Sequence, residues 1–255
     1  MTPGAYATGS LRKRALDVLV AGGALLVTLP LTLIALAAVW LSDRGNPLYV
    51  SERIGRHGRP FRFLKIRTMV TGAGASAVDT TVAGDPRVTA VGRCIRALKV
   101  DELPQLLHVL SGRMSMVGPR PNVPREVALY TAEERGLLEV RPGITDPASI
   151  VFADLATALR NVADPNIAYN QLVRPWKSRL GLHYLCCASF ANDLRILAYT
   201  FSVLFARRWT LLRLSALLRH TGAPEDLCRF VRREGPLRPL PPPGADAIVT
   251  HRSSE

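Results

Sequence analysis

Acidic residues and cysteines are both scarce in this chain of 255 residues. Asp and Glu number 20 against 33 Lys and Arg, so the formal net charge is +13 and the pI is near 10.4. This shortage of negative charge favours polyanionic partners: nucleic acid, anionic lipid headgroups or phosphorylated small molecules. A hydrophobic fraction of 48% and a positive mean hydropathy exclude a disordered basic tail protein. Lipid and phosphate fit both properties better than nucleic acid does.

The four cysteines lack the spacing of a metal site. Cys94, Cys186, Cys187 and Cys228 form no C-x-x-C pair, which excludes the usual zinc frameworks. A reducing cytosol is therefore the simplest location for these side chains. Internal repeats are also absent, and the length suits one substantial core, or one domain with membrane attachments.

What the chain does have is one long apolar segment, from Ala15 to Leu41, which exceeds the ~20 residues needed to cross a bilayer core. Basic residues 12–14 before it raise the alternative of a cleavable signal peptide. The segment is too long for the apolar region of such a peptide, and its one small-x-small site, at 35–37, is followed by more apolar sequence. Asp17 inside the first turn also favours a retained helix.

Pro30 lies near the middle of this segment, where it removes a backbone hydrogen bond and kinks a helix. A sharply bent helix dips into one leaflet and returns, whereas a straight helix puts its ends on opposite sides. Basic residues flank both ends, with Arg44 and Arg53 on the far side, so both ends prefer the cytoplasm. The pattern predicts a re-entrant helix broken at Pro30; a single-pass anchor with a tolerated proline is the alternative.

Two strands are predicted after the apolar segment, from Leu48 to Ile54 and from Phe61 to Arg67, around the turn residues 55–58. In the second strand, Lys65 and Arg67 share one face with two phenylalanines because of the two-residue period. Two cations on one rigid face are well placed to hold a phosphate. A solvated hairpin edge with basic gatekeepers explains the pattern equally well.

Helices are predicted for much of the remaining sequence. They include Val91–Val100, Leu103–Leu110 and a region from Pro175 to about Arg219, whose apolar surface is bordered by arginines. Such a surface is typical of a helix that lies on a membrane or packs on the core. The small-residue segment Thr71–Asp85 is predicted to be a mobile loop. Pro236–Glu255 is Pro-rich with little apolar pattern, so a disordered tail is expected.

Two adjacent carboxylates, Asp101 and Glu102, are the clearest candidates for chemistry. Pro104 fits the first turn of a helix, which puts both carboxylates at a helix N-terminus, where the dipole favours their ionised forms. Successive helical residues project about 100° apart, so one can face a substrate while the other ligates a metal. An ionised carboxylate can attack phosphorus, and Mg²⁺ with oxygen ligands is the natural stabiliser of the leaving phosphate. Simple N-capping is the alternative.

Two arginines in Pro/Gly-rich turns are candidates for binding that phosphate. Arg120 lies between Pro119 and Pro121, which limit its backbone freedom, and guanidinium groups bind phosphate bidentately. Arg141 precedes Pro142 and Gly143 in a second tight turn. A rigid structural loop with a solvated arginine is the alternative reading of the first turn.

Four short motifs occur in a fixed order: Lys-Ile-Arg-Thr-Met from Lys65, Asp-Glu-Leu-Pro-Gln from Asp101, Met-Ser-Met-Val-Gly-Pro-Arg-Pro from Met114 and Arg-Pro-Gly-Ile-Thr from Arg141. With the apolar segment, they make roughly residues 11–205 resemble the bacterial sugar transferase family, the monotopic phosphoglycosyl transferases. No single motif is decisive, but the ordered set is highly specific. The resemblance implies transfer of a sugar 1-phosphate from a UDP-sugar to polyprenyl phosphate, usually undecaprenyl phosphate, with release of UMP.

The resemblance also implies residue roles. Asp101 would be the nucleophile that carries a covalent phosphosugar, and Glu102 its partner in Mg²⁺ binding or activation. Pro30 would be the break of the re-entrant helix. Phosphate contacts would fall on four basic residues: Lys65, Arg67, Arg120 and Arg141. Three positions depart from the family's pattern, namely His108, Arg113 and Asp146, where relatives commonly have asparagine, an acidic residue and glycine. These departures weaken any transfer of sugar specificity, but they leave the carboxylate pair intact.

We therefore expect a mixed α/β, predominantly helical fold with a re-entrant membrane helix, a small β-hairpin and a compact cytosolic catalytic domain with amphipathic interfacial helices. The expected division is a flexible N-terminus at 1–10, the membrane helix at 11–44, the catalytic domain at 45–220 and a Pro/Arg-rich, largely disordered tail at 221–255. The expected location is the cytoplasmic face of the bacterial inner membrane. There the enzyme would initiate exopolysaccharide, O-antigen or capsule-type synthesis, with inner-membrane lipid and polysaccharide assembly enzymes as further partners.

Two other classes of function stay open. A non-catalytic, membrane-anchored scaffold of a polysaccharide assembly complex is disfavoured by the intact carboxylate pair beside intact phosphate motifs. A membrane-tethered nucleic-acid binder rests on charge alone. The sequence has no recognisable reading helix and no aromatic base-stacking platform, so nucleic acid is not an expected partner.

Overall fold

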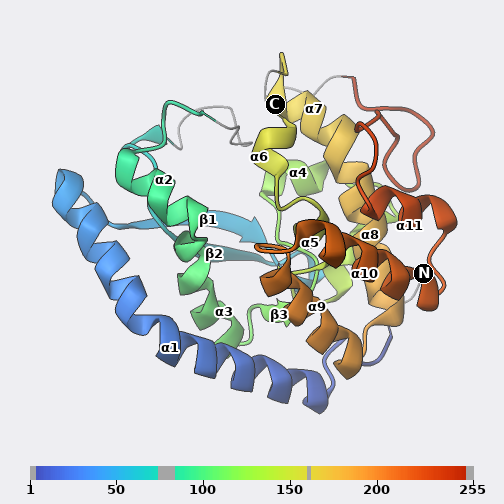
Figure 1. Ribbon diagram of the computed structural model, residues 1–255, viewed down its shortest axis with the longest axis horizontal. Coiled ribbons are helices and arrows are strands. Elements are labelled where there is room, and N and C mark those ends of the chain that lie inside the picture. The colour runs from blue at the N-terminus through green and yellow to red at the C-terminus, as the bar shows by residue number, and fades with distance from the viewer. Residues whose placement is uncertain (1–3, 74–83, 160–161, 251–255) are drawn as a thin grey trace.

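Helices dominate the computed structural model, which describes residues 4–73, 84–159 and 162–250 (Figure 1). The expected mixed α/β, mostly helical class is confirmed. The longer elements are α1 (Leu11–Asp43), β1 (Leu48–Ile54), β2 (Pro60–Ile66), α2 (Ala90–Ala97), α8 (Arg174–Cys187), α9 (Phe190–Ser202), α10 (Arg207–His220) and α11 (Glu225–Val231). Short elements between them are η1 (Arg56–Gly58), η3 (Val100–Gln105), α3 (Leu106–Leu110), β3 (Ser115–Val117), α4 (Pro124–Ala128), η4 (Glu134–Glu139), β4 (Gly143–Thr145), α5 (Pro147–Val151), α6 (Leu155–Ala158), α7 (Pro165–Ala168) and η5 (Tyr169–Val173). Most of the loop expected at Thr71–Asp85 lies outside the described residues.

Helix α1 bends but does not break. It runs through Pro30 as one helix of 33 residues, and Figure 1 shows it changing direction about midway. The predicted helix-break-helix is therefore wrong in this respect. Pro30 removes one backbone bond, yet the good helix formers on both sides continue the helix. Thr28 and Thr32 lie on either side of the proline and bond back to the carbonyls of Ala24 and Thr28, an arrangement that often bends helices.

Two buried charges fasten the N-terminal part of α1 to the core. Lys13 Nζ lies 2.6 Å from Asp193 Oδ2 on α9 and donates to the carbonyl of Val117 at 2.9 Å. Asp17 accepts bonds from the backbone N–H of Met116 at 2.8 Å and from Ser115 Oγ at 2.9 Å. Buried polar contacts thus connect α1 to strand β3 and to helix α9.

The segment before α1 is also held in place. The Gly4 N–H donates to the carbonyl of Leu185, Ala7 is buried, and the Tyr6 hydroxyl donates to Asp193. Residues 4–10 are therefore ordered, contrary to the expected flexible N-terminus. The reason is that Asp193 accepts bonds from both Tyr6 and Lys13, so the same buried carboxylate fixes this segment and the helix that follows.

The two predicted strands are confirmed to within one residue. β1 and β2 pair antiparallel, with Tyr49 opposite Lys65 and Arg53 opposite Phe61. Phe63 is buried against the ring of His108, whose Nε2 accepts the N–H of Leu64 at 3.1 Å. The hairpin therefore packs on α3 and on the turn that precedes it.

A second, parallel pair of short strands brings two loops into backbone contact. β3 pairs with β4, and Gly118 and Gly143 face each other at its end. A Cβ on Gly143 would lie 2.2 Å from the nitrogen of Gly118, and a Cβ on Gly118 would lie 2.7 Å from the carbonyl oxygen of Arg141. Only glycine fits this close approach.

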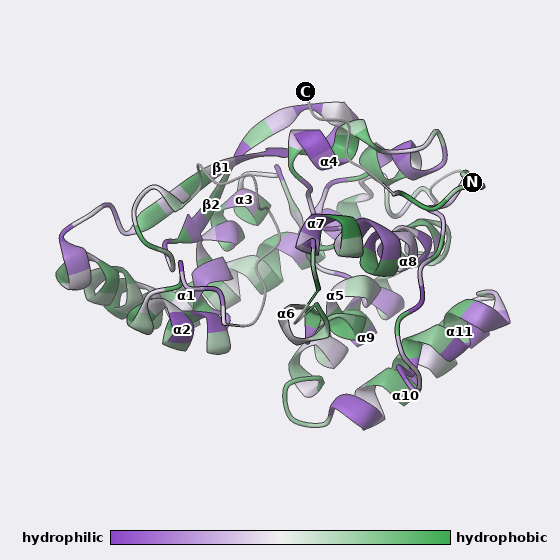
Figure 2. Ribbon diagram, turned by 90° about the horizontal axis from the view of Figure 1, so that it is seen from above, coloured by the Kyte–Doolittle hydropathy of each residue, from purple (hydrophilic) through white to green (hydrophobic). Residues whose placement is uncertain are grey.

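The main core lies where α5, α8, α9 and α10 surround the β3–β4 pair. Fully buried members include Met114, Val117, Ile150, Leu180 and Leu214. A smaller cluster of Ala35, Val39, Ile66, Ile95 and Val100 holds the second half of α1 against β2, α2 and η3. Figure 2 shows hydrophobic residues along most of α1 and a mixed pattern in α10 and α11.

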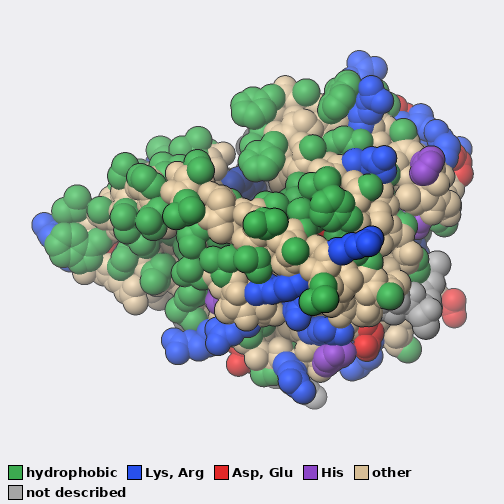
Figure 3. Space-filling view, turned by 90° about the horizontal axis from the view of Figure 1, so that it is seen from below, with side chains coloured by type: hydrophobic (Ala, Val, Ile, Leu, Met, Phe, Trp, Pro, Cys, Tyr) green, Lys and Arg blue, Asp and Glu red, His purple; other side chains and the backbone are tan. Residues whose placement is uncertain are grey.

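The outer side of α1 is apolar and exposed. It carries Leu11, Leu19, Leu26, Val27 and Ile34, each more than half exposed. A second exposed apolar group lies at the junction of α9 and α10: Phe201, Leu204, Phe205, Trp209 and Leu212. Figure 3 shows hydrophobic side chains across one face of the molecule, with basic side chains at its border. Helix α1 is long and apolar enough to cross a membrane.

The C-terminal segment is ordered as far as the structure describes it, contrary to the expected tail. α11 covers Glu225–Val231, and Leu227, Cys228 and Val231 are buried. Further along, Thr131 Oγ1 donates to the carbonyl of Pro243 and Arg179 to that of Pro241. Proline-rich sequence needs no strand or helix to pack, because exposed carbonyls accept bonds from neighbouring side chains.

Candidate active site

Asp101 and Glu102 lie in a 3-10 turn that precedes a short α-helix. The turn, η3, begins after Lys99, which adopts a left-handed conformation with φ 58°, and α3 begins only at Leu106. Val100 and Pro104 are buried on either side of the pair. The buried neighbours thus hold both carboxylates within the 3-10 turn. The sequence predicted a helix from Leu103, whereas the α-helix begins only at Leu106.

Glu102 is held by two cations from separate segments. Arg120 makes a bidentate contact with it, Nη2 to Oε1 at 2.5 Å and Nη1 to Oε2 at 3.0 Å. Lys65 Nζ on β2 lies 3.3 Å from Glu102 Oε1 and 3.6 Å from Asp101 Oδ2. The sequence-predicted residues Asp101, Glu102, Lys65 and Arg120 therefore form one cluster.

The charges in this cluster balance one another. Burial alone would raise the pKa of Glu102, but the positive charges of Arg120 and Lys65 outweigh it and hold that pKa well below its usual range. Burial lowers the pKa of Lys65, and the charge of Glu102 opposes the shift. Glu102 is ionised at neutral pH and forms ion pairs with both Arg120 and Lys65. Among the described residues, Asp101 forms an ion pair only with Lys65.

The other predicted site residues lie elsewhere. Arg67 follows β2 and forms a bidentate pair with Asp43 at the end of α1, with both contacts at 2.6 Å. Arg141 lies near Arg56 and the start of α1, in a different hollow. Pro30 lies within α1 and contributes no side chain to the carboxylate cluster. For Arg67, the two-residue period could not reveal that the strand ends at Ile66 or that Asp43 neutralises the guanidinium.

Two further arginines belong to the surroundings of the pair. Arg53 on β1 stacks over the ring of Phe63 at 5.6 Å, and burial, reinforced by the charge of Arg120, lowers its pKa to about 10. Arg96 on α2 donates to Thr68 Oγ1 at 2.7 Å, and the negative charge of Asp101 acts on its guanidinium. In the sequence, Arg53 was interpreted only as a charge flanking the membrane segment.

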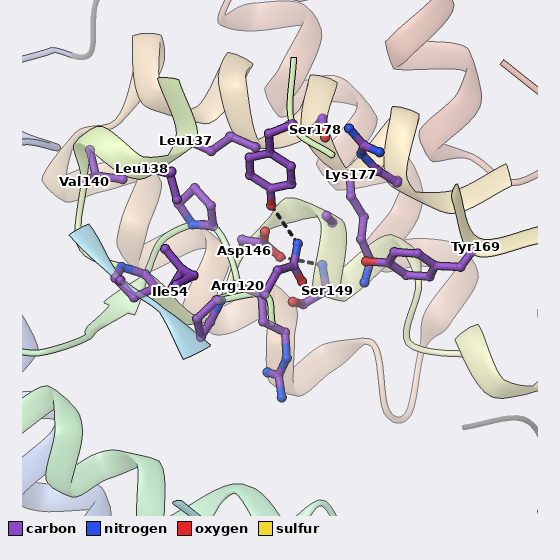
Figure 4. Close-up of a pocket in the computed structure, with 18 residues that line it drawn as sticks. Ile54, Arg120, Leu137, Leu138, Val140, Asp146, Ser149, Tyr169, Lys177 and Ser178 are labelled. Atoms are coloured by element: carbon purple, nitrogen blue, oxygen red, sulfur yellow. Dashed lines mark hydrogen bonds between the residues drawn. The ribbon is translucent and has the colours of Figure 1, made fainter. Parts of the chain in front are cut away.

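A pocket adjoins the cluster through Arg120 (Figure 4). Asp146 and Ser149 lie at its centre, with the N–H of Ser149 donating to Asp146 Oδ1 at 2.6 Å. Lys177 from α8 and Tyr169 from η5 reach it from the other side, with Lys177 Nζ 5.2 Å from the centre of the Tyr169 ring. Sequence reasoning missed Lys177 and Tyr169, because nothing in a helical pattern marks which polar residue faces a pocket.

Lys177 is the most perturbed cation of this pocket. Burial lowers its pKa to about 8, while the charge of Asp146 partly opposes the shift. Burial raises the pKa of Asp146, and its bonds to Ser149 oppose that. Within the described residues, the Lys177 ammonium forms no ion pair and lies over the rings of Phe152 and Tyr169. A partly buried ammonium without an ion pair among the described residues suits an anionic ligand.

The donor set suits magnesium only in part. Nowhere in the described ranges do three or more His, Cys, Asp or Glu side chains gather as a metal-binding group. Mg²⁺ is commonly held by one or two carboxylates together with substrate phosphates and water. Asp101 retains oxygen atoms for such a role, whereas Glu102 would first have to release Arg120 or Lys65. A cation shared between Asp101 and a phosphorylated substrate is the arrangement that these residues fit.

A pair of carboxylates in contact with the half-buried Lys65 and Arg120, beside a pocket with more cations, is suited to phosphorylated substrates. The sequence profile of the bacterial sugar transferase family matches residues 8–207. The chain therefore belongs to this family, and it is a transferase.

Individual relatives agree with this class. The chain is 41% identical over 153 residues to the exopolysaccharide production protein ExoY of Rhizobium meliloti, covering 54% of this chain and 67% of that protein. It is 43% identical over 143 residues to the UDP-glucose:undecaprenyl-phosphate glucose-1-phosphate transferase of Caulobacter vibrioides, covering 55% of this chain and 54% of that one. For a putative undecaprenyl-phosphate N-acetylgalactosaminyl 1-phosphate transferase of Bacillus subtilis, identity is 41% over 112 residues, with 44% and 63% covered.

Proposed function

We propose that the chain is a phosphoglycosyl transferase that moves a sugar 1-phosphate from a UDP-sugar to undecaprenyl phosphate and releases UMP. The observation that carries the proposal is the unequal pairing of the two carboxylates. Both oxygens of Glu102 are engaged by Arg120 and Lys65, whereas Asp101 is buried, contacts one cation and keeps oxygens for bonding. Family membership and the activities after which the relatives are named support the reaction class.

In the proposed first step, Asp101 attacks the β-phosphorus of the donor. A bond forms between a carboxylate oxygen and phosphorus, and the bond from that phosphorus to the bridging oxygen breaks. UMP leaves with the electron pair, and an acyl phosphate bearing the sugar stays on Asp101. Lys65 lies 3.6 Å from Asp101, close enough to offset charge on the transferred group.

In the second step, a phosphate oxygen of the polyprenyl acceptor attacks the same phosphorus. The acyl phosphate bond breaks, Asp101 returns as a carboxylate, and the product is a polyprenyl diphosphate sugar. Glu102 positions Lys65 and Arg120 throughout, because it is the carboxylate that holds both. Bound Mg²⁺, held at Asp101 and the substrate phosphates, would supply charge neutralisation for the pyrophosphate.

The pocket beside Arg120 is the proposed place of the donor. Its cations, Arg120 and Lys177, match the two phosphates, and Tyr169 offers an aromatic face beside them. Asp146 and Ser149 provide hydrogen-bonding groups of the kind that recognise hydroxyls. The exposed apolar sides of α1 and of the α9–α10 junction would lie in the cytoplasmic leaflet of the inner membrane. There the product would initiate exopolysaccharide, O-antigen or capsule-type synthesis.

The test is UMP release by the purified full chain supplied with undecaprenyl phosphate and a panel of UDP-sugars. At least one donor should give release that requires the acceptor and is lost when EDTA removes Mg²⁺. Asp101→Asn should lower turnover by about 10³-fold or more, because the amide is a poor nucleophile. Its thermal unfolding should match that of the parent.

Asp226→Asn is the matched control, since this aspartate is exposed on α11 and should leave turnover unchanged. Turnover retained in Asp101→Asn would contradict the nucleophile assignment. A chain that binds UDP-sugars but releases no UMP with any donor would contradict the activity and favour the scaffold alternative.

A further inference from the structure

A second basic hollow lies apart from the carboxylate pair. It has a volume of about 410 Å³ and is lined by four arginines from three segments: Arg56 and Arg59 in the turn between β1 and β2, Arg113 after α3 and Arg141 before β4. Its other lining residues include His57 and Phe61, and none of its lining residues carries a carboxylate. It adjoins the donor pocket only at Gly55.

Three of these guanidinium groups have no partner within the described residues. The side chains of Arg59, Arg113 and Arg141 form no hydrogen bond or ion pair there, while Arg56 donates to the carbonyl of Glu139 at 3.0 Å. Two carboxylates act near the hollow: Glu139 lies 3.6 Å from His57 Nδ1, and the charge of Asp17 acts on Arg141. Positive charges that lie close together without partners repel one another. An anion bound in the hollow would relieve this repulsion.

The hollow opens at the start of the apolar helix. A Cβ on Gly9, next to the N-cap of α1, would lie 3.6 Å from Nη1 of Arg141 and 3.8 Å from Nη1 of Arg56. Leu11 and Leu19, on the first turns of α1, are 87% and 75% exposed. Two arginines of the hollow, Arg56 and the unpaired Arg141, therefore lie beside the start of the helix that carries these exposed leucines.

We propose that this hollow binds the phosphodiester of an anionic glycerophospholipid, whose acyl chains lie along the outer side of α1. The ligand must satisfy cations and apolar side chains that are contiguous, which a free phosphate or a nucleotide does not. Guanidinium groups pair bidentately with phosphate oxygens, and two or three of them can share one diester. The site goes beyond the proposed reaction, since it uses neither Asp101 nor Glu102.

The experiment is native mass spectrometry of the full chain in neutral detergent, titrated with dioleoylphosphatidylglycerol or with dioleoylphosphatidylcholine. The parent should bind the anionic lipid at least ten times more tightly than the zwitterionic one. Arg59→Glu/Arg113→Glu should weaken phosphatidylglycerol binding at least tenfold, because it reverses two of the four charges. Both arginines are exposed, so the variant should keep the parent's unfolding temperature.

Arg93→Glu/Arg229→Glu is the matched control, with the same change in net charge at exposed positions on α2 and α11. Equal loss in both double variants would mean that net charge alone attracts the lipid, and would overturn the site. Unchanged binding in Arg59→Glu/Arg113→Glu would overturn it as well.

Competition distinguishes the sources of phosphate. Inorganic phosphate or UMP at millimolar concentration should not displace bound phosphatidylglycerol, and full displacement by either would overturn the lipid assignment. The assay involves no turnover, so Asp101→Asn should bind the lipid as the parent does. The lipid site and the proposed reaction can therefore fail separately.

Discussion

At the scale of single residues, two carboxylates that are adjacent in sequence have unlike surroundings. Glu102 contacts Arg120 and Lys65 together, while Asp101 has an ion pair with Lys65 alone among the residues that the structure describes. The sequence motif predicted the pair and two of its cations, because Lys65 and Arg120 lie in motifs of their own. It could not predict Lys177 or Tyr169, which reach the neighbouring pocket from α8 and η5 and are placed by packing alone.

If the pocket beside Arg120 binds the donor, Lys177 gives that binding a specific pH dependence. Burial lowers its pKa to about 8, so its charge is present below that pH and is lost as the pH rises through it. If this ammonium contacts the donor's phosphates, the KM for the donor should rise between pH 7 and pH 9, because the positive charge is lost. The choice of buffer should have little effect on KM. Lys177→Arg should flatten the rise, since the guanidinium stays charged over this range.

Initial rates of UMP release over a range of donor concentrations at each pH provide the measurement. Arg179→Lys, on the same helix but hydrogen-bonded to the C-terminal segment, is the control and should keep the parent's profile. A donor KM independent of pH in the parent would rule out a charge contribution from Lys177.

At the scale of elements, the predictions succeeded for β1 and β2 because alternation and turn residues are local signals. The predictions failed where contacts with residues distant in the sequence determine the local structure. The pattern around Pro30 could not show that α1 stays continuous, and the proline-rich segment gave no sign of the carbonyls that Thr131 and Arg179 bind. The sequence did not reveal the anchor of residues 4–10, because Asp193 lies far along the chain.

The attachment of α1 to the core rests on the buried pair of Lys13 and Asp193, whose side chains are 6% and 0% exposed. Lys13→Met should destabilise the fold by about 3–5 kcal/mol, because it leaves a buried carboxylate without its cation. Lys13→Met/Asp193→Leu should recover part of that loss, since no isolated charge is left behind.

Thermal unfolding of the full chain in detergent measures these differences. Arg12→Met, at the neighbouring exposed position, is the control and should change stability little. If Lys13→Met unfolds at the parent's temperature, the pair does not secure the helix.

At the scale of the whole molecule, the C-terminal segment is part of the folded unit. The N–H of Leu240 donates to the carbonyl of Gln171 in η5. Arg179 in α8 donates to the carbonyl of Pro241. A chain ending at Gly235 should lose about 1 kcal/mol or more, which corresponds to a fall in Tm of about 2–4 °C. Differential scanning calorimetry checks this. A chain ending at Thr250 is the reference, and equal melting of the two truncated chains would mean that residues 236–250 add no stability.

The bend in α1 bears on how the molecule lies in a membrane. If the helix enters and leaves one leaflet, reporter tags at the N-terminus and at Gly72 should both be modified only from the cytoplasmic side. A matched Pro30→Leu chain, with the proline constraint removed, should label the N-terminal tag from the opposite side in a measurable fraction of molecules. Labelling of the two tags on opposite sides in the parent would establish a single span instead.

The glycines that meet at the end of β3 and β4 have a consequence for how this site can be rebuilt. Neither can gain a side chain without parting the two turns, so the turn bearing Arg120 and the turn from Arg141 to Gly143, which leads through β4 to Asp146, keep one spacing. In protein engineering, the two turns therefore have to be exchanged together. A chimaera that imports residues 114–121 from a relative while keeping residues 141–149 should misplace the grafted arginine, whereas moving both together should preserve the site.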